Sequence, residues 1–178
     1  MKFYIETERL ILRDMQLTDV DGMFALDSDP KVHLYLGNNP IAKKEEAIKS
    51  ITYIQQQYQE HKIGRWAVIE KASGDFIGWS GLKLNTEEKL NDHINFYDVG
   101  YRFIPKYWGK GYATETAIAT LQYGFNKMKL KTIIGVADVK NIGSNKVLRK
   151  IGLQHVNEFY YKDGTLCNWY EISAAAIK

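Results

Sequence analysis

The sequence predicts an α+β protein with a mixed β-sheet of about seven strands and about four helices. Three observations lead to this fold class. Apolar residues recur at helical spacing in segments 43–60 and 113–128. Segments 65–84 and 153–173 contain strand-forming residues on either side of short turns. The expected order of elements is β-α-α-β-β-β-α-β-α-β-β, which is typical of an α+β architecture.

The length and composition fit one globular domain covering residues 1–178. Of the 178 residues, 45% are hydrophobic, 25% charged and 13% aromatic, which excludes collagen, a coiled coil and a disordered chain. The 24 basic and 21 acidic residues leave a net charge of +3, so the charge alone does not indicate direct nucleic-acid binding.

Cysteine content and the N-terminus predict the compartment. Cys167 is the only cysteine, which excludes an internal disulfide and a cysteine-based metal site. The segment Met1–Arg9 carries charges where a signal peptide needs an apolar stretch. We therefore expect a soluble, cytoplasmic protein with no membrane partner.

The first half of the chain predicts an opening strand, two helices and a hairpin. Thr18 is the expected cap of the first helix, with Asp21 in its first turn, where the helix dipole favours an acidic residue. The expected elements are a strand at 10–13, a helix starting near 17–21, a loop at 29–40, a helix at about 43–60, and strands at 65–70 and 76–84.

The second half predicts a long strand, two helices and a final hairpin. Gly100 lies inside the long strand and indicates a bulge, and Pro105 ends the strand. Gly152 ends the second of the two helices. The expected elements are a strand at about 94–104, a helix opened by the turn 108–111, a strand at 131–137, a helix at 141–151, and strands near 153–162 and 166–173.

The turn Trp108–Gly111 is the most informative feature of the sequence. A strand leads into two glycines and then into a helix N-terminus, which carries free N–H groups and the positive end of the helix dipole. Glycines allow close backbone approach, so this turn suits a diphosphate. The simpler interpretation is an ordinary strand-to-helix turn, and the glycines alone do not decide between the two.

Two other phosphate motifs do not fit this turn. A Walker loop needs a glycine where Ile104 stands and Ser or Thr where Gly111 stands. A Rossmann fingerprint needs a third glycine at Thr114, in the first βαβ unit of the chain. A nucleotide-binding protein of either kind is therefore excluded.

Three segments together resemble the GNAT acetyltransferases. Residues 108–115, Trp-Gly-Lys-Gly-Tyr-Ala-Thr-Glu, are similar to that family's acetyl-CoA pyrophosphate loop, in the form typical of the RimJ/RimL-like branch. Residues 6–13 resemble the opening T-x-R-L-x-L-R strand of that branch, and residues 141–153 resemble its later N-x-x-S helix. The resemblance follows family order along nearly the whole chain. It implies the GNAT fold, with a mostly antiparallel sheet splayed at two parallel central strands.

The resemblance also implies a binding site for acetyl-CoA as co-substrate, without a metal. The pantetheine arm would enter between the strands at about 94–104 and 131–137, pairing with the backbone of Phe103 and Ile104. Asn141 lies where the family often contacts the arm, and Lys110 and Lys146 could add charge near the phosphates, although ordinary solvation explains each lysine equally well. The expected cofactor-binding residues are Phe103, Ile104, Trp108, Gly109, Lys110, Gly111, Tyr112, Ala113, Thr114, Asn141 and Lys146.

Two residues are candidates for proton transfer in the implied reaction. Asp98 is the candidate base for the attacking amine, at a position where relatives often carry a carboxylate; the alternative is an acid paired with Arg or Lys. Many family members protonate the leaving thiolate with a tyrosine, but that position here is Leu148. Ser144 is the replacement candidate, and its alternative role is to cap the helix. Neither role is required, because positioning alone can supply much of the acceleration.

The resemblance implies acetyl transfer to a primary amine by direct attack in a ternary complex. The acceptor is expected to be a protein N-terminus or a small-molecule amine. Two alternatives stay open: an acetyltransferase for an antibiotic, amino acid or polyamine, and a catalytically silent acyl-CoA-binding or regulatory module. The sequence leaves the oligomeric state open between monomer and homodimer.

Overall fold

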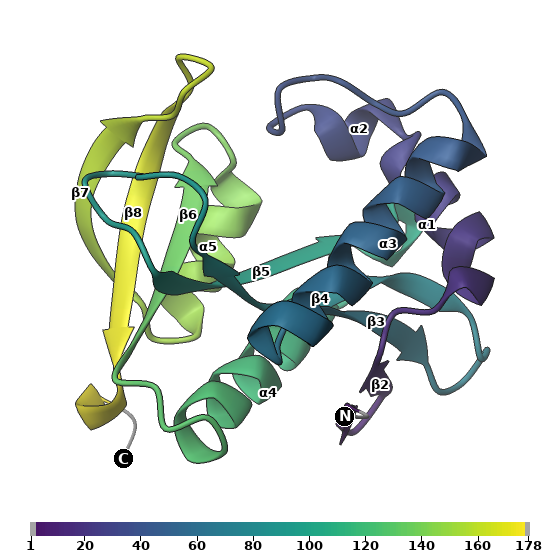
Figure 1. Ribbon diagram of the computed structural model, residues 1–178, viewed down its shortest axis with the longest axis horizontal. Coiled ribbons are helices and arrows are strands. Elements are labelled where there is room, and N and C mark those ends of the chain that lie inside the picture. Colours follow the sequence, from purple (N-terminus) through teal and green to yellow (C-terminus); the bar gives the residue numbers. More distant parts are fainter. Residues whose placement is uncertain (1–2, 177–178) are drawn as a thin grey trace.

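The computed structural model describes residues 3–176 and has an α+β architecture built on one eight-stranded sheet (Figure 1). Met1 and Lys2 of the charged N-terminal stretch lie outside the described residues. The strand order is β1-β2-β3-β4-β5-β6-β8-β7. The strands are β1 (Tyr4–Glu6), β2 (Leu10–Arg13), β3 (Arg65–Glu70), β4 (Phe76–Asn85), β5 (Phe96–Phe103), β6 (Thr132–Asp138), β7 (Gln154–Tyr160) and β8 (Leu166–Ser173).

Helices cover both faces of the sheet. On one face, Ala117 and Leu121 of α4 and Leu148 of α5 pack into the largest apolar core. On the other, Met23 of α1 and Ile51 of α3 form a second core against the sheet. The helices are α1 (Val20–Asp27), α2 (Pro30–His33), α3 (Lys44–His61), α4 (Tyr112–Asn126) and α5 (Ile142–Lys150), with short 3₁₀ turns η1 (Leu17–Asp19), η2 (Pro105–Tyr107) and η3 (Ala174–Ala176). None of the helices within residues 3–176 has both the length and the apolar character that crossing a bilayer requires.

The central strands β5 and β6 are parallel and paired at one position only. Their register joins Asp98 to Ile134, and every other neighbouring pair in the sheet is antiparallel. Figure 1 shows β6, β7 and β8 grouped at one side and α1–α3 at the other, with β5 running between them. The predicted splayed sheet is therefore confirmed, and the backbone edges of β5 and β6 beyond Asp98 and Ile134 lack strand partners.

A third, smaller core lies behind the final hairpin. It contains Phe159, Cys167 and Trp169, which are buried together with Ile134. Burial raises the pKa of the Cys167 thiol to about 11. This core joins the β7–β8 hairpin firmly to β6.

The structure differs from the sequence predictions in local details. The edge strand β1 and the short helix α2 were not expected. Thr18 is not a cap: the chain enters α1 through η1, where Gln16 is the N-cap and the Asp19 carboxylate accepts a hydrogen bond from the Gln16 N–H at 2.8 Å. Gly100 is not a bulge, because the β4–β5 register is continuous through its pairing with Gly81. Register shifts occur instead between β7 and β8, at His155 and Asn157, and between β3 and β4, at Val68 and Ile69.

Gly78, which pairs with Val68 beside the β3–β4 shift, lies close to the backbone of β5. Its φ is +153°, and a Cβ there would lie 2.1 Å from the Arg102 carbonyl oxygen. We expect Gly78→Ala to lower the free energy of unfolding by about 3 kcal/mol, because backbone strain and overpacking add. Urea denaturation measures the change.

Gly74→Ala is the matched control. Gly74 also has a positive φ of +75°, but no atom of the described chain lies within 4 Å of its added Cβ. Its expected cost is about 1 kcal/mol, from backbone strain alone. Equal losses in the two variants would show that the close approach at Gly78 is unimportant.

Candidate active site

A glycine turn delivers the chain from η2 into the N-terminus of α4. Gly109 and Gly111 have φ angles of +74° and +82°, which favour glycine. Gly111 is the N-cap of α4 and, having no side chain, makes no side-chain cap. The first helical hydrogen bond runs from the Glu115 N–H to the Gly111 carbonyl, so the N–H groups of residues 112–114 have no partner within the helix. These donors and the helix dipole suit an anion.

Cationic and aromatic side chains surround this turn. The Lys110 ammonium lies 5.1 Å from the centre of the Tyr107 ring, and Lys106 lies 4.8 Å from the same ring. The Tyr112 hydroxyl donates to the Glu70 carboxylate at 2.6 Å, and this hydrogen bond is the main cause of a lowered Glu70 pKa. The Tyr112 side chain is thereby directed to β3, while its backbone N–H remains at the helix end.

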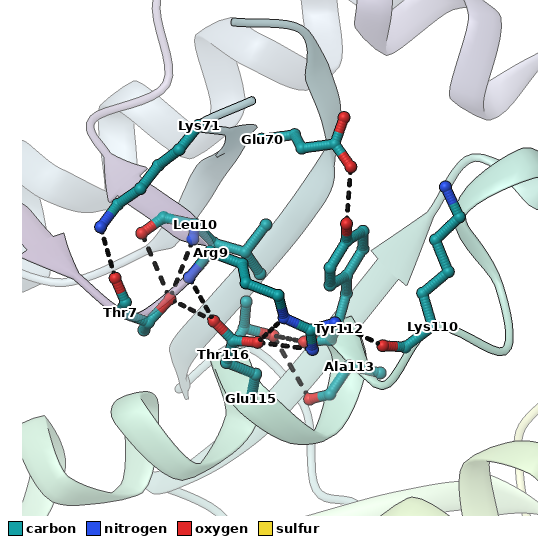
Figure 2. Close-up of polar contacts among 10 residues, drawn as sticks. All are labelled: Thr7, Arg9, Leu10, Glu70, Lys71, Lys110, Tyr112, Ala113, Glu115 and Thr116. Atoms are coloured by element: carbon teal, nitrogen blue, oxygen red, sulfur yellow. Dashed lines mark hydrogen bonds and ion pairs between the residues drawn. The ribbon is translucent and has the colours of Figure 1, made fainter. Parts of the chain in front are cut away.

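The β1–β2 turn supports the loop from behind (Figure 2). The Arg9 guanidinium donates to the Lys110 carbonyl at 2.9 Å and forms an ion pair with Glu115 at 2.6 Å. Burial raises the pKa of Glu115, but the hydrogen bonds from Thr7 and Arg9 outweigh burial, so the pKa is lowered overall. Two of the three segments that resemble family motifs, 6–13 and 108–115, therefore touch each other.

The end of β5 presents one backbone edge toward the splay. The Phe103 carbonyl accepts a hydrogen bond from Trp108 Nε1 at 2.6 Å, and the Ile104 N–H donates to the Ile77 carbonyl at 3.0 Å. The N–H and C=O of one strand residue point to the same edge, so Phe103 directs both groups away from β4. The Ile104 N–H is already paired. Of the two predicted backbone contacts, the geometry therefore favours Phe103 over Ile104. A ligand would have to displace the Trp108 indole from the Phe103 carbonyl.

Asp98 lies at the point where β5 and β6 separate, and its carboxylate is fully engaged. One oxygen forms an ion pair with Arg65, and the other accepts from Asn85 Nδ2 at 2.6 Å. Arg65 Nη1 also donates to the Asp98 carbonyl at 2.8 Å. The Arg65 guanidinium lies over Gly100, where an added Cβ would be 2.7 Å from Nη2. The geometry favours the ion-paired interpretation of Asp98, and Gly100 provides room for Arg65.

Ser144 and Asn141 meet at the start of α5. Asn141, rather than Ser144, caps the helix, because its side-chain oxygen accepts from the Ser144 N–H at 3.0 Å. The Ser144 hydroxyl lies 3.2 Å from the Tyr101 hydroxyl, which also donates to the Ser144 carbonyl at 3.1 Å. Burial raises the pKa of Tyr101, so this hydroxyl stays protonated near neutral pH. The contact links β5 to α5 beside the splay.

Lys146 lines a hollow beside α5. This hollow, of about 350 Å³, lies beside α5 and is lined by Val139, Ile142, Asn145, Lys146, Arg149 and Asn168. Neither Ser144 nor any residue of the turn 108–111 is among the residues that line it. Among residues 3–176, no three His, Cys, Asp or Glu side chains gather as a metal site requires.

Three side chains at the site were not among the sequence candidates. Arg65 pairs with Asp98, Tyr101 contacts Ser144, and Arg9 holds the Lys110 carbonyl. Arg9 had a sequence signal, since it belongs to the T-x-R segment. Arg65 and Tyr101 had none, because their roles depend on which strands are neighbours.

Comparison with known proteins identifies the family. Residues 9–154 match the family described as "Acetyltransferase (GNAT) domain". The chain is 30% identical over 164 residues to the uncharacterized N-acetyltransferase YoaA of Bacillus subtilis, with 90% of each chain covered. Its fold is similar to the crystal structure of a GNAT acetyltransferase from Bacillus anthracis, with a TM-score of 0.81, 26% identity, and 97% and 99% of the two chains covered.

A further structure shares the fold at lower identity. It is RimL, a ribosomal L7/L12 alpha-N-protein acetyltransferase solved with coenzyme A, with a TM-score of 0.79, 18% identity, and 96% and 98% of the two chains covered. At this identity the likeness concerns the fold alone. On the family match and the similarity to YoaA, the chain belongs to the GNAT acetyltransferase family.

Proposed function

We propose that this protein transfers an acetyl group from acetyl-CoA to a primary amine by direct attack in a ternary complex. The observation that carries the proposal is the uncapped N-terminus of α4 after Gly109 and Gly111, beside the splay of β5 and β6. The helix N-terminus suits a diphosphate, and the open strand edges suit an extended arm that contains amides. Both occur together in a chain that belongs to an acetyltransferase family.

The proposed cofactor site uses mostly backbone groups. The N–H groups of residues 109–114 hold the pyrophosphate, with Lys110 adding positive charge. The Phe103 backbone pairs with a pantetheine amide after Trp108 releases its carbonyl. The Asn141 amide lies at the opposite side of the splay, on the turn that opens α5. Acetyl-CoA supplies the acetyl group as a thioester; the chain supplies orientation.

The reaction needs two proton movements. The amine nitrogen forms a bond to the acetyl carbon, the C–S bond breaks, the amine loses a proton and the thiolate gains one. We propose that the Ser144 hydroxyl donates a hydrogen bond to the leaving thiolate, and that a proton from solvent, balancing the one lost by the amine, neutralises it. Asp98 would have to leave Arg65 and Asn85 to accept the amine proton. The geometry therefore favours loss of the amine proton to water. Asp98 then has a structural role, binding Arg65 where β5 and β6 separate.

The acceptor class is proposed from the branch resemblance. The RimJ/RimL-like motifs favour a protein N-terminal amine, and an antibiotic, amino acid or polyamine is the alternative within the same chemistry. A silent acyl-CoA-binding module is the second candidate function. The observation favouring it is Leu148, which is buried in the core where many relatives have a tyrosine acid.

Acetyl-CoA should raise the melting temperature of the purified protein in a concentration-dependent way, because ligand binding to the native state stabilises it. A panel of amines and peptides incubated with acetyl-CoA should then include acceptors that release free CoA thiol. Stabilisation by ATP or NAD but not by acetyl-CoA would contradict the cofactor. Binding without thiol release from any acceptor would favour the silent module.

Gly111→Ala should weaken acetyl-CoA binding by about tenfold or more, because an αL alanine is strained at the helix cap and its Cβ would press on Arg9 Nη2, at 3.4 Å, behind the loop. Isothermal titration measures the dissociation constant. Gly74→Ala, with a similar φ of +75° in a remote turn, is the control. Equal affinity in wild type and Gly111→Ala would place the pyrophosphate elsewhere.

Asp98→Asn should lower the free energy of unfolding by about 2 kcal/mol, because Arg65 loses a charged partner in a largely buried site. The pH profile of kcat/KM, measured with an acceptor from the panel, should keep its shape. Loss of the acidic limb of that profile, with the fold intact by circular dichroism, would instead identify Asp98 as the base.

A further inference from the structure

We propose that Arg9 is a positioning residue for the phosphate-binding loop: it holds the Lys110 carbonyl and thereby directs the Gly111 N–H toward the ligand. The inference deepens the proposed function and rests on it. Arg9 belongs to the β1–β2 turn, about a hundred residues from the loop in sequence. It touches no ligand in this arrangement and acts only through the backbone it orients.

The Arg9 guanidinium contacts three residues of the loop and helix and lies next to a fourth, Gly111. Nη1 donates to the Lys110 carbonyl at 2.9 Å, and Nε donates to Glu115 Oε2 at 2.7 Å. The Arg9 Cζ lies 4.5 Å from the centre of the Tyr112 ring. A Cβ at Gly111 would lie 3.4 Å from Arg9 Nη2, so the guanidinium lies against the bare Cα of this glycine. Figure 2 shows the side chain lying along the start of α4.

The direction of the Lys110 carbonyl also determines the direction of the Gly111 N–H, because both belong to one planar peptide. The described chain contains no cis peptide bond, so the Lys110 carbonyl and the Gly111 N–H point in opposite directions. Because the carbonyl faces Arg9, the N–H faces away from it, toward the open side of the turn. Without Arg9, the freedom of two flanking glycines would let this peptide rotate. Arg9 therefore reduces the cost of ordering the loop when an anion binds.

The same guanidinium offsets an unfavourable charge. Glu115 is the fourth residue of α4, and a carboxylate near a phosphate site would repel the ligand. Both of its oxygens are engaged behind the helix: Thr7 Oγ1 donates to Oε1 at 2.6 Å, the Arg9 N–H donates to Oε1 at 3.0 Å, and Arg9 binds Oε2. Glu115 thus anchors Arg9, and Arg9 balances its charge.

The β1–β2 turn that carries Arg9 is itself well held. The Thr7 N–H donates to the Leu10 carbonyl at 2.9 Å, and the Lys71 N–H donates to the Arg9 carbonyl at 3.0 Å. The Lys71 ammonium pairs with Glu6 at 2.6 Å. Lys71, directly after β3, and the pairing of Leu10 with Glu70 therefore fix the position from which Arg9 reaches the loop.

Calorimetric titration with CoA tests the proposal. Arg9→Ala should raise the dissociation constant about tenfold, because CoA binding must then order a loop that Arg9 no longer holds. Arg9→Lys should recover only part of the loss, because one ammonium cannot reproduce a fork that binds Glu115 along one edge and Lys110 with its remaining nitrogen. In the ligand-free protein, the ¹⁵N–¹H resonance of Gly111 should move in Arg9→Ala, since its peptide loses a polarising partner.

Arg13→Ala is the matched control. Arg13 lies on β2 and pairs with the buried Asp19 at 2.7 Å, so this variant loses stability without touching the loop. It should keep the wild-type affinity for CoA and the Gly111 resonance. Wild-type affinity in Arg9→Ala, with an unmoved Gly111 resonance, would overturn the role of Arg9 alone. A wild-type protein that does not bind CoA would overturn the proposed function, and the role of Arg9 with it.

Discussion

The separation of β5 and β6 is the constraint on which the rest of this structure depends. Backbone N–H and C=O groups in a sheet interior normally pair with the next strand, and unpaired buried groups are costly. Here the ladder stops after Asp98 and Ile134. Beyond this point the Trp108 indole covers one edge group of β5, the Phe103 carbonyl, and the Tyr101 hydroxyl joins β5 to Ser144 of α5. The fold therefore keeps donors and acceptors at its centre available for exchange.

Two arginines hold the elements that border this opening. Arg65 crosses from β3 over Gly100 and binds both the carbonyl and the carboxylate of Asp98, the last paired residue of β5. Arg9 crosses from the β1–β2 turn and binds the loop that begins α4. A guanidinium suits both positions, because its planar fork binds a carboxylate and a carbonyl at once. The rigid half of the sheet thus determines the shape of the site at its middle.

The sequence was sufficient for the fold class, the splay and the glycine turn, but not for these arginine contacts. Periodicity and turn residues locate the long elements, and the family motifs locate the loop. The three residues of β1 form a strand only because β2 lies beside them. Thr18 does not cap the first helix, because the Asp19 carboxylate accepts the hydrogen bond from the Gln16 N–H instead. Asp98 could be placed on its strand, yet its partner depends on Gly81 and Gly100 being cross-strand neighbours. Such pairing depends on register, which local patterns do not contain.

The buried Cys167 has a practical consequence for studying this protein. Thiol reagents react with thiolates, and a buried thiol with a pKa of about 11 is almost wholly protonated at neutral pH. It is also the only cysteine of the chain. In the folded protein, a colorimetric reagent that counts free sulfhydryls would therefore register CoA released in the proposed reaction against a very low background. The native enzyme can be followed continuously, without first replacing its cysteine.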